Sequence, residues 1–201
     1  MIGSLIIVLF FSAGVAAGLY GVSLNFLKIS DPSIYALYFL MFLVGIGIGS
    51  DFNIWNVLKK MNLKILVVPF IVILGTLSGT YICSFFLEDI GALDSIAIGA
   101  GFGYYSLSSI IISKMRSDSL GVMALLANIS REIFTLLAAP LLVKYFGKLA
   151  PIASGGATSM DTTLPVIAKY SGKEYAVISV FSGVVLTILV PFLIALIYRF
   201  I

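Results

Sequence analysis

Charged side chains inside long apolar runs are the residues of this sequence that are best placed to do chemistry. Arg131 and Glu132 lie about a dozen residues into one such run, which is about 18 Å along a helix and near the middle of a bilayer. Asn128 precedes them and Thr135 follows them at spacings of three and four, so the four side chains are predicted to form one polar stripe. A charge at that depth costs about 2.5–3.5 kcal/mol. Either a function compensates for this cost, or buried ion pairs hold helices together. In the second case Arg131 and Glu132 are expected to have separate partners, because adjacent residues on a helix do not face each other.

A second ionisable group, Asp161, lies in a short polar stretch between two apolar runs. The hydroxyl groups near it belong to Thr158, Ser159, Thr162 and Thr163. A helix interrupted at membrane depth exposes unpaired backbone groups and its dipole ends, and many transporters build substrate and ion sites from such breaks. A carboxylate there suits a cation. Alternatively, Asp161 or a neighbouring hydroxyl group caps a helix that begins near Leu164, and both roles can hold together.

The same pattern of glycines followed by hydroxyl groups occurs earlier in the chain. Three glycines between positions 99 and 103 are followed by Tyr105, Ser106 and Ser108. Corresponding interruptions in two apolar segments indicate a binding site, so these three residues are candidate ligands, although Tyr105 is also typical of a membrane interface. Asp51, at the glycine-rich end of another apolar run, is either a further ligand or an interfacial helix cap.

The composition indicates the elements that must position these groups. Of the 201 residues 61% are hydrophobic and 10% are charged, whereas soluble domains carry roughly 25% charged residues. We expect an all-α polytopic membrane protein that forms a single transporter domain over residues 1–201. Gly75 and Gly79 predict a packing face on one helix. The chain has about seven hydrophobic segments, near residues 2–20, 32–49, 65–87, 92–113, 120–145, 149–170 and 175–198.

Two of these segments, 92–113 and 149–170, are predicted to be discontinuous, and each either spans or re-enters the membrane. Basic residues in short loops favour the cytoplasm, which places the N-terminus inside and the C-terminus outside the cell membrane. If every segment spans, Lys144 and Lys148 fall outside and violate the rule. Either these lysines are exceptions, or the number of spans between segments four and six is wrong.

Several classes of protein are disfavoured. The chain has no histidine and one cysteine, Cys83, so an internal disulfide is impossible and a metal site is not expected. No clustered basic face favours nucleic acid, and no phosphate-binding loop is present. We therefore expect no cofactor beyond a coupling ion, H⁺ or Na⁺, handled by carboxylates. An enzyme is not expected, although an intramembrane dyad of Glu132 and Asp161 stays an alternative.

Three motifs together resemble the bacterial and archaeal lysine exporter family, LysO. They are AGFGYYSLS at 100–108, LLANISRE at 125–132 and GGATSMDTTLP at 155–165, and the likeness includes LVGIG at 43–47. The resemblance implies a secondary transporter, an antiporter, that exports L-lysine and toxic lysine analogues across the cytoplasmic membrane. It makes Glu132 and the loop around Asp161 the prime site residues. An ammonium group of lysine suits either carboxylate, and the α-carboxylate suits a half-helix N-terminus or Arg131.

Many members of that family carry an additional N-terminal hydrophobic region, and this chain is expected to start after it. The missing helices would come from a homodimer or from a small membrane partner. The alternative function is therefore a membrane subunit that transports only together with such a partner.

Overall fold

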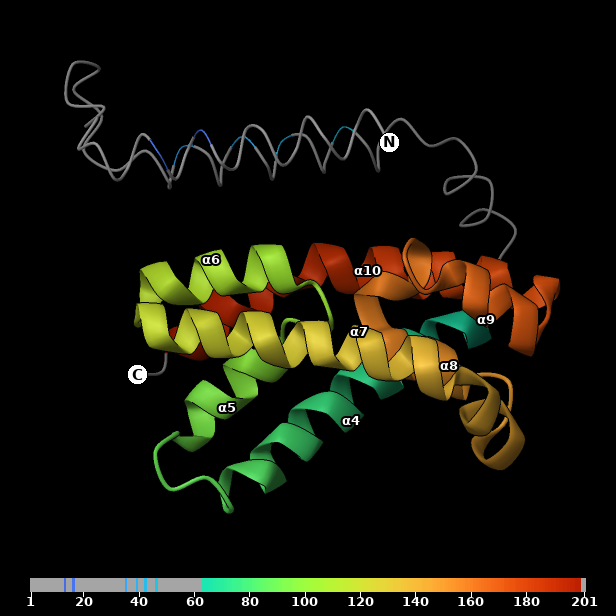
Figure 1. Cartoon of the computed structure of the whole chain (residues 1–201), viewed down its shortest axis with the longest axis horizontal. Coiled ribbons are helices and arrows are strands. Elements are labelled where there is room, and N and C mark those ends of the chain that lie inside the picture. Colours follow the sequence, from blue (N-terminus) through green and yellow to red (C-terminus); the bar gives the residue numbers. More distant parts are fainter. Residues whose placement is uncertain are drawn as a thin grey trace. The chain divides into compact units, whose positions relative to one another are not determined.

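The computed structural model describes residues 63–199 and the single positions 13, 16, 35, 39, 42 and 46. The chain divides into two compact units, Met1–Gly45 and Ile46–Ile201, and the fold below is that of the second. Within residues 63–199 all regular structure is helical (Figure 1), as predicted for an all-α protein. The first two hydrophobic segments and Asp51 lie outside the described residues, so the number of seven segments stays a prediction.

Three long helices form the frame of this unit. They are α4 (Val67–Ser84), which follows the short 3-10 helix η2 (Leu63–Leu66), α7 (Asp118–Phe146) and α10 (Lys173–Tyr198). Each is long and apolar enough to cross a membrane, because even the 18 residues of α4 extend about 27 Å along a helix. The segments predicted near 65–87, 120–145 and 175–198 are therefore confirmed as continuous helices.

Two pairs of short helices lie between the long ones. The first pair is α5 (Ala92–Gly99) and α6 (Tyr105–Met115), and the second is α8 (Ala150–Gly155) with the 3-10 helix η3 (Gly156–Met160) and α9 (Leu164–Ser171). The longest of them, α6, has 11 residues and extends about 17 Å, well short of the roughly 30 Å of a bilayer core. The interruptions predicted in segments 92–113 and 149–170 are present.

Each pair folds back to the end from which it started. The side chain of Asp94, in the first turn of α5, lies 3.3 Å from that of Arg116, which follows α6. Likewise, Lys148, before α8, lies 3.6 Å from Glu174, after α9. The two pairs are therefore re-entrant hairpins, named hairpin A (residues 92–115) and hairpin B (residues 150–171), and they enter from opposite ends of the bundle (Figure 1).

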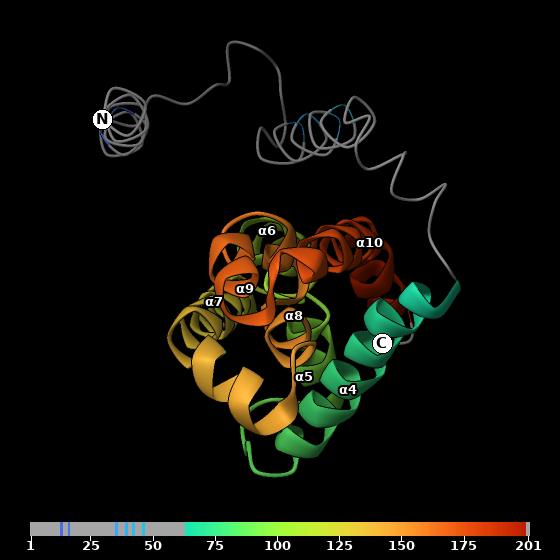
Figure 2. The same ribbon diagram turned by 90° about the vertical axis from the view of Figure 1, so that its right-hand side faces the viewer.

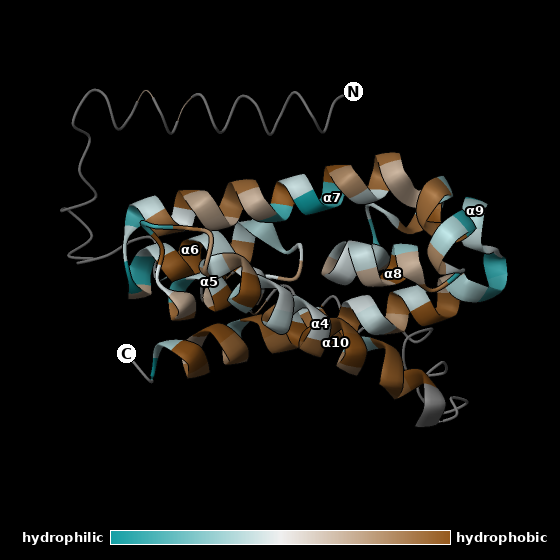
Figure 3. Cartoon of the chain, turned by 90° about the horizontal axis from the view of Figure 1, so that it is seen from below, coloured by the Kyte–Doolittle hydropathy of each residue, from teal (hydrophilic) through white to brown (hydrophobic). Residues whose placement is uncertain are grey.

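The bundle exposes many large apolar side chains on its outside and buries polar side chains inside together with apolar ones such as Phe102 and Ile112. Seen end-on, α5 and α8 lie between α4, α7 and α10 (Figure 2). Helices α4 and α10 are hydrophobic along most of their length, whereas hydrophilic bands interrupt α7 (Figure 3). Phe70, Leu137 and Phe192 on these helices are each more than half exposed. Such a surface suits contact with lipid. The packing face predicted at Gly75 and Gly79 is not formed within residues 63–199, since a Cβ atom at either glycine would have no neighbour within 4 Å.

Candidate functional site

The breaks of the two hairpins meet inside the bundle. Tip A (residues 100–104) joins α5 to α6, and tip B (residues 156–163) joins α8 to α9. The backbone N–H of Ala157 donates a hydrogen bond to the carbonyl oxygen of Phe102 at 2.8 Å. Gly156, with φ of +62°, presses against that same carbonyl, and a Cβ atom on Gly103 would lie 3.0 Å from the carbonyl oxygen of Gly155. Only glycine permits so close a crossing of two backbones.

Asn128 of α7 satisfies the broken backbone of hairpin A. Its side-chain oxygen accepts a hydrogen bond from the N–H of Gly103 at 2.7 Å. Its amide nitrogen donates to the carbonyl of Ile98, in the last turn of α5, at 3.1 Å and to that of Ala124 at 2.8 Å. Because the last carbonyls of a helix lack partners within that helix, a buried amide here stabilises the interruption. The predicted site residue Asn128 therefore holds tip A in place.

Arg131, one helical turn further along α7, does the same for hairpin B. Its Nε donates to the carbonyl of Ser154 at 2.7 Å and one Nη to that of Ala153 at 2.9 Å, both in the last turn of α8. The other Nη lies 3.3 Å from the hydroxyl of Thr76 in α4. A cation at a helix C-terminus also interacts favourably with the helix dipole. Among the described residues no carboxylate pairs with Arg131, so it does not pair with Glu132. The separate partner expected for Glu132 stays a prediction.

Within the described part of the chain, only three of the four residues in the polar stripe predicted on α7 form hydrogen bonds with the two hairpins. Thr135 is fully buried and its hydroxyl lies 2.7 Å from that of Ser154, so it joins Asn128 and Arg131 against the two tips. Glu132, in contrast, is partly exposed. Within residues 63–199 its carboxylate has neither a hydrogen bond nor an ion pair.

The polar side chains of tip B are engaged mainly with the tip itself. The hydroxyl of Thr158 donates to the carbonyl of Gly155 at 2.9 Å, and that of Thr163 to the carbonyl of Thr158 at 3.0 Å. The hydroxyl of Ser159 donates to the carbonyl of Ser179 in α10, whose own hydroxyl donates back to the carbonyl of Ser159 at 2.7 Å. These buried hydroxyl groups therefore fix the shape of tip B and attach it to α10.

Helix α9 begins at Leu164, as predicted, but the predicted side-chain cap is absent. Thr163 occupies the N-cap position and makes no side-chain capping hydrogen bond. Asp161 instead accepts a hydrogen bond from the N–H of its neighbour Thr162, at 2.5 Å, and both residues are exposed. The capping interpretation is wrong because the nearby hydroxyl groups bond to backbone carbonyls within the tip, a common alternative for short polar side chains.

The N-terminus of α6 also lacks a side-chain cap. Tyr104 holds its N-cap position without a capping hydrogen bond, and among the described residues the backbone N–H groups of Ser106 and Leu107 have no partner. Tyr105 and Ser106 are partly exposed there, whereas Ser108 is fully buried and bonds to the carbonyl of Tyr104 at 2.9 Å. An uncapped helix N-terminus favours an anionic group.

The carboxylate of Asp161 lies within electrostatic range of the side chain of Tyr104, the residue at the N-cap position of α6. The tips therefore combine an open, positive helix end with an exposed carboxylate. Thr76, Ser154 and Ser179 also belong to this arrangement, although they were not predicted as site residues. Hydroxyl groups inside apolar runs were the only signal for them, and their partners are distant in sequence.

Re-entrant hairpins that meet by their tips within a bundle of apolar helices define a polytopic membrane protein with interrupted helices, an architecture that transporters use. The chain matches the family model for the lysine exporter LysO over residues 8–198, and it belongs to that family. Membership favours a transporter over an enzyme.

Two relatives illustrate the similarity. The lysine exporter LysO of Escherichia coli strain K12 is 34% identical over 185 residues, which cover 90% of this chain and 60% of that protein. A Haemophilus influenzae protein provisionally named a lysine exporter is 34% identical over 165 residues, 82% of this chain and 83% of its own length. The chain thus spans less than two thirds of the length of the Escherichia coli relative. No solved structure matches it.

Proposed function

We propose that this chain exports L-lysine and lysine analogues across the cytoplasmic membrane as a secondary transporter. One observation carries the proposal: two interrupted helices cross inside the bundle, and tip B carries an exposed carboxylate, Asp161, that no cation among the described residues neutralises. Family membership and the two relatives named as lysine exporters support the choice of substrate.

The charges of free lysine complement those of the tips. Lysine has one carboxylate and two ammonium groups. The unpaired N–H groups of Ser106 and Leu107 suit the carboxylate, because backbone donors at a helix N-terminus bind anions. Asp161, near that N-terminus, suits the α-ammonium, and Glu132 suits the second ammonium. Arg131 is less suited to the carboxylate, since three protein acceptors already occupy its guanidinium.

Coupling to an inward H⁺ or Na⁺ falls on one of these carboxylates. Lysine and the coupling cation compete for it, so the site never holds an uncompensated negative charge at depth, where such a charge is costly. Glu132 is our candidate, because it is partly exposed and has no partner among the described residues.

Replacing Glu132 with Gln tests this assignment in proteoliposomes. The neutral amide should abolish uphill lysine export while leaving the protein folded and inserted, as judged by its elution from a sizing column. The matched control Glu88→Gln makes the same change at an exposed carboxylate away from the tips and should leave export intact. Uphill export at the normal rate in the Glu132→Gln protein contradicts the assignment.

The orientation follows from the charges at the two ends of the bundle. At the lysine-rich end, where α7 ends and α10 begins, the basic residues are Lys64, Lys144, Lys148, Lys169 and Lys173. At the other, acidic end, Glu88, Asp89, Asp94 and Asp118 outnumber Lys114, Arg116 and Arg199. The positive-inside rule places the lysine-rich end in the cytoplasm and the C-terminus outside. Re-entry of hairpin A turns α7 so that Lys144 and Lys148 lie at the cytoplasmic end, and re-entry of hairpin B keeps Lys169 and Lys173 at that end, so the conflict is removed.

A second candidate function is a subunit that transports only with a partner. The observation that favours it is length, because this chain matches only 60% of the Escherichia coli exporter. In that case a second copy or a small membrane protein would complete the transporter. Lysine export by the purified chain alone supports the first function, and export that appears only after a second polypeptide is added supports the second.

A further inference from the structure

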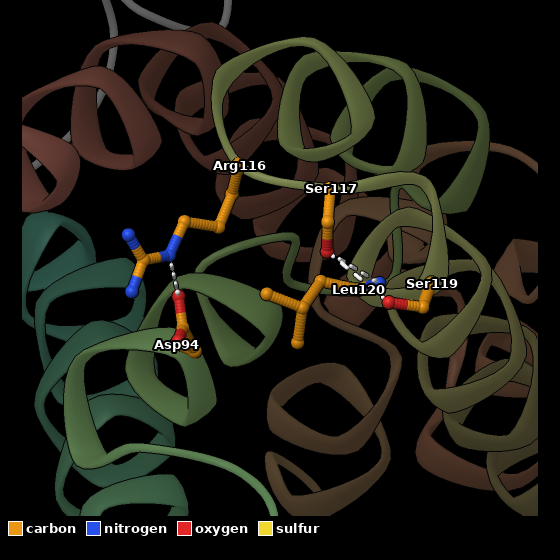
Figure 4. A network of polar contacts seen from close by, with 5 residues as sticks. All are labelled: Asp94, Arg116, Ser117, Ser119 and Leu120. Carbon is orange, nitrogen blue, oxygen red and sulfur yellow. Dashed lines mark hydrogen bonds and ion pairs between the residues drawn. The ribbon is translucent and has the colours of Figure 1, made fainter.

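The acidic end of the bundle holds a polar cluster that the proposed substrate site does not use. Asp94 at the start of α5 and Arg116 after α6 form an ion pair, with Oδ1 and Nε 3.3 Å apart (Figure 4). The hydroxyl of Tyr198, in the last turn of α10, lies within electrostatic range of the same carboxylate. Among the described residues neither this hydroxyl nor Oδ1 of Asp94 has a hydrogen-bond partner, although both are buried. Three helices therefore converge on one carboxylate at the base of hairpin A.

The ion pairs at the bases of the two hairpins differ in burial. The side chain of Asp94 is 12% exposed and that of Arg116 is 43% exposed. In the pair at the base of hairpin B, Lys148 is 53% and Glu174 67% exposed. Exposed pairs contribute little. In the pair of hairpin A only Asp94 is nearly buried, and removing its partner Arg116 leaves that nearly buried charge uncompensated, which is more costly. Hairpin A is therefore held at its base more firmly than hairpin B.

The turn beside Arg116 is also well ordered by local hydrogen bonds. The hydroxyl of Ser117 accepts a hydrogen bond from the N–H of Leu120 at 3.4 Å and so caps α7. The same hydroxyl lies 3.2 Å from that of Ser119 (Figure 4). This cap fixes where α6 ends and α7 begins, and it holds Arg116 opposite Asp94.

Densely packed side chains lie between this base and the tips. Ala97 of α5, Phe102 of tip A, and Ser108 and Ile112 of α6 are all fully buried. A solute that leaves the tips toward the acidic end therefore requires hairpin A to move. Since α10 packs against both α5 and α6, that movement separates hairpin A from α10 at the place where Tyr198 approaches Asp94.

We propose that Asp94 and Arg116, with Tyr198 beside them, form a latch that keeps hairpin A closed against α10, and that its release opens the path from the tips toward the side of the C-terminus. The inference rests on the proposed function, because the solute that passes along this path is the exported lysine. The three residues act through the position of hairpin A and do not contact the passenger.

Thiol labelling tests the latch without any transport measurement. In the full chain with Cys83→Ala, the change Ser108→Cys places one small thiol at a fully buried position of α6. A membrane-impermeant thiol reagent is added on the C-terminal side of sealed vesicles, and then separately on the opposite side. Arg116→Gln should raise the rate of labelling from the C-terminal side about tenfold, which corresponds to about 1.4 kcal/mol. Arg116→Lys keeps the charge and should stay near the parent rate.

Three further variants make the result specific. Lys148→Gln breaks the exposed pair of hairpin B and should leave labelling from the C-terminal side unchanged. Asp94→Asn should match Arg116→Gln, and the double variant should add nothing further. The latch is refuted if Arg116→Gln labels at the parent rate, if Arg116→Lys rises equally, or if labelling increases alike from both sides. Lysine export is measured on the parent chain as well. If the parent chain exports lysine and the labelling results fail, only the latch is refuted; if the parent chain does not export lysine, the proposed function fails.

Discussion

Arg131 offers the sharpest distinction between a residue that holds the fold and a residue that binds substrate. Its guanidinium donates to the carbonyls of Ala153 and Ser154, and Arg131→Met leaves both without a partner. An unsatisfied buried carbonyl costs about 1–3 kcal/mol. Because these contacts are part-buried, we take about 1–2 kcal/mol for each carbonyl. Arg131→Met should therefore lower the free energy of unfolding by about 2–4 kcal/mol.

Unfolding of the purified protein in detergent, followed by denaturant titration, measures this loss. Arg131→Lys should recover only part of it, since an ammonium cannot reproduce the planar fork of a guanidinium. Thr76→Val removes the remaining acceptor and should cost about 1 kcal/mol at most. If Arg131→Met is as stable as the parent and loses only lysine binding, then Arg131 contacts the substrate and our account of the α8 terminus is incorrect.

Three other predictions follow from the tips and the ends of the bundle. Gly156→Ala should destabilise the protein by at least about 1–2 kcal/mol, the cost of a left-handed conformation in a residue with a Cβ atom. The reason is that Gly156 has a φ of +62° and lies against the carbonyl of Phe102. An unchanged unfolding midpoint contradicts this prediction. Asp161→Asn should weaken lysine binding at least about tenfold, since hydrogen bonds to charged groups contribute about 1.5–3 kcal/mol, with little change in stability because the side chain is exposed; equal affinity in a binding titration argues against its role. In a Cys83→Ala background, cysteines at 147 and 173 should label from the cytoplasmic side and a cysteine at 117 from the outer side; labelling of 147 and 173 from different sides is incompatible with a re-entrant hairpin B.

The helices and their interruptions could be predicted because both depend on local sequence. Long apolar runs predicted α4, α7 and α10, and clustered glycines with hydroxyl groups marked both breaks. Re-entry could not be predicted, because hydropathy does not distinguish two half-helices that continue across a membrane from two that turn back. The conflict at Lys144 and Lys148 was the only signal of it in the sequence.

The roles of single polar residues depended on contacts that no local pattern contains. Asn128 and Arg131 appear on α7 as a stripe suited to a ligand, yet each serves a helix end that lies more than twenty positions away in the sequence. The capping role expected near Asp161 failed for a related reason, because backbone carbonyls of tip B compete for the same hydroxyl groups. The role of Glu132 stays a prediction.

The central claim is that carboxylates beside two crossed helix breaks bind a positively charged passenger, and lysine counterflow tests it most directly. Proteoliposomes that contain the purified chain are loaded with unlabelled lysine and diluted into a trace of labelled lysine. We predict transient accumulation of label by the parent protein and none by the double variant Glu132→Gln, Asp161→Asn, with both proteins folded. Accumulation of label by the double variant at the parent rate would contradict the claim.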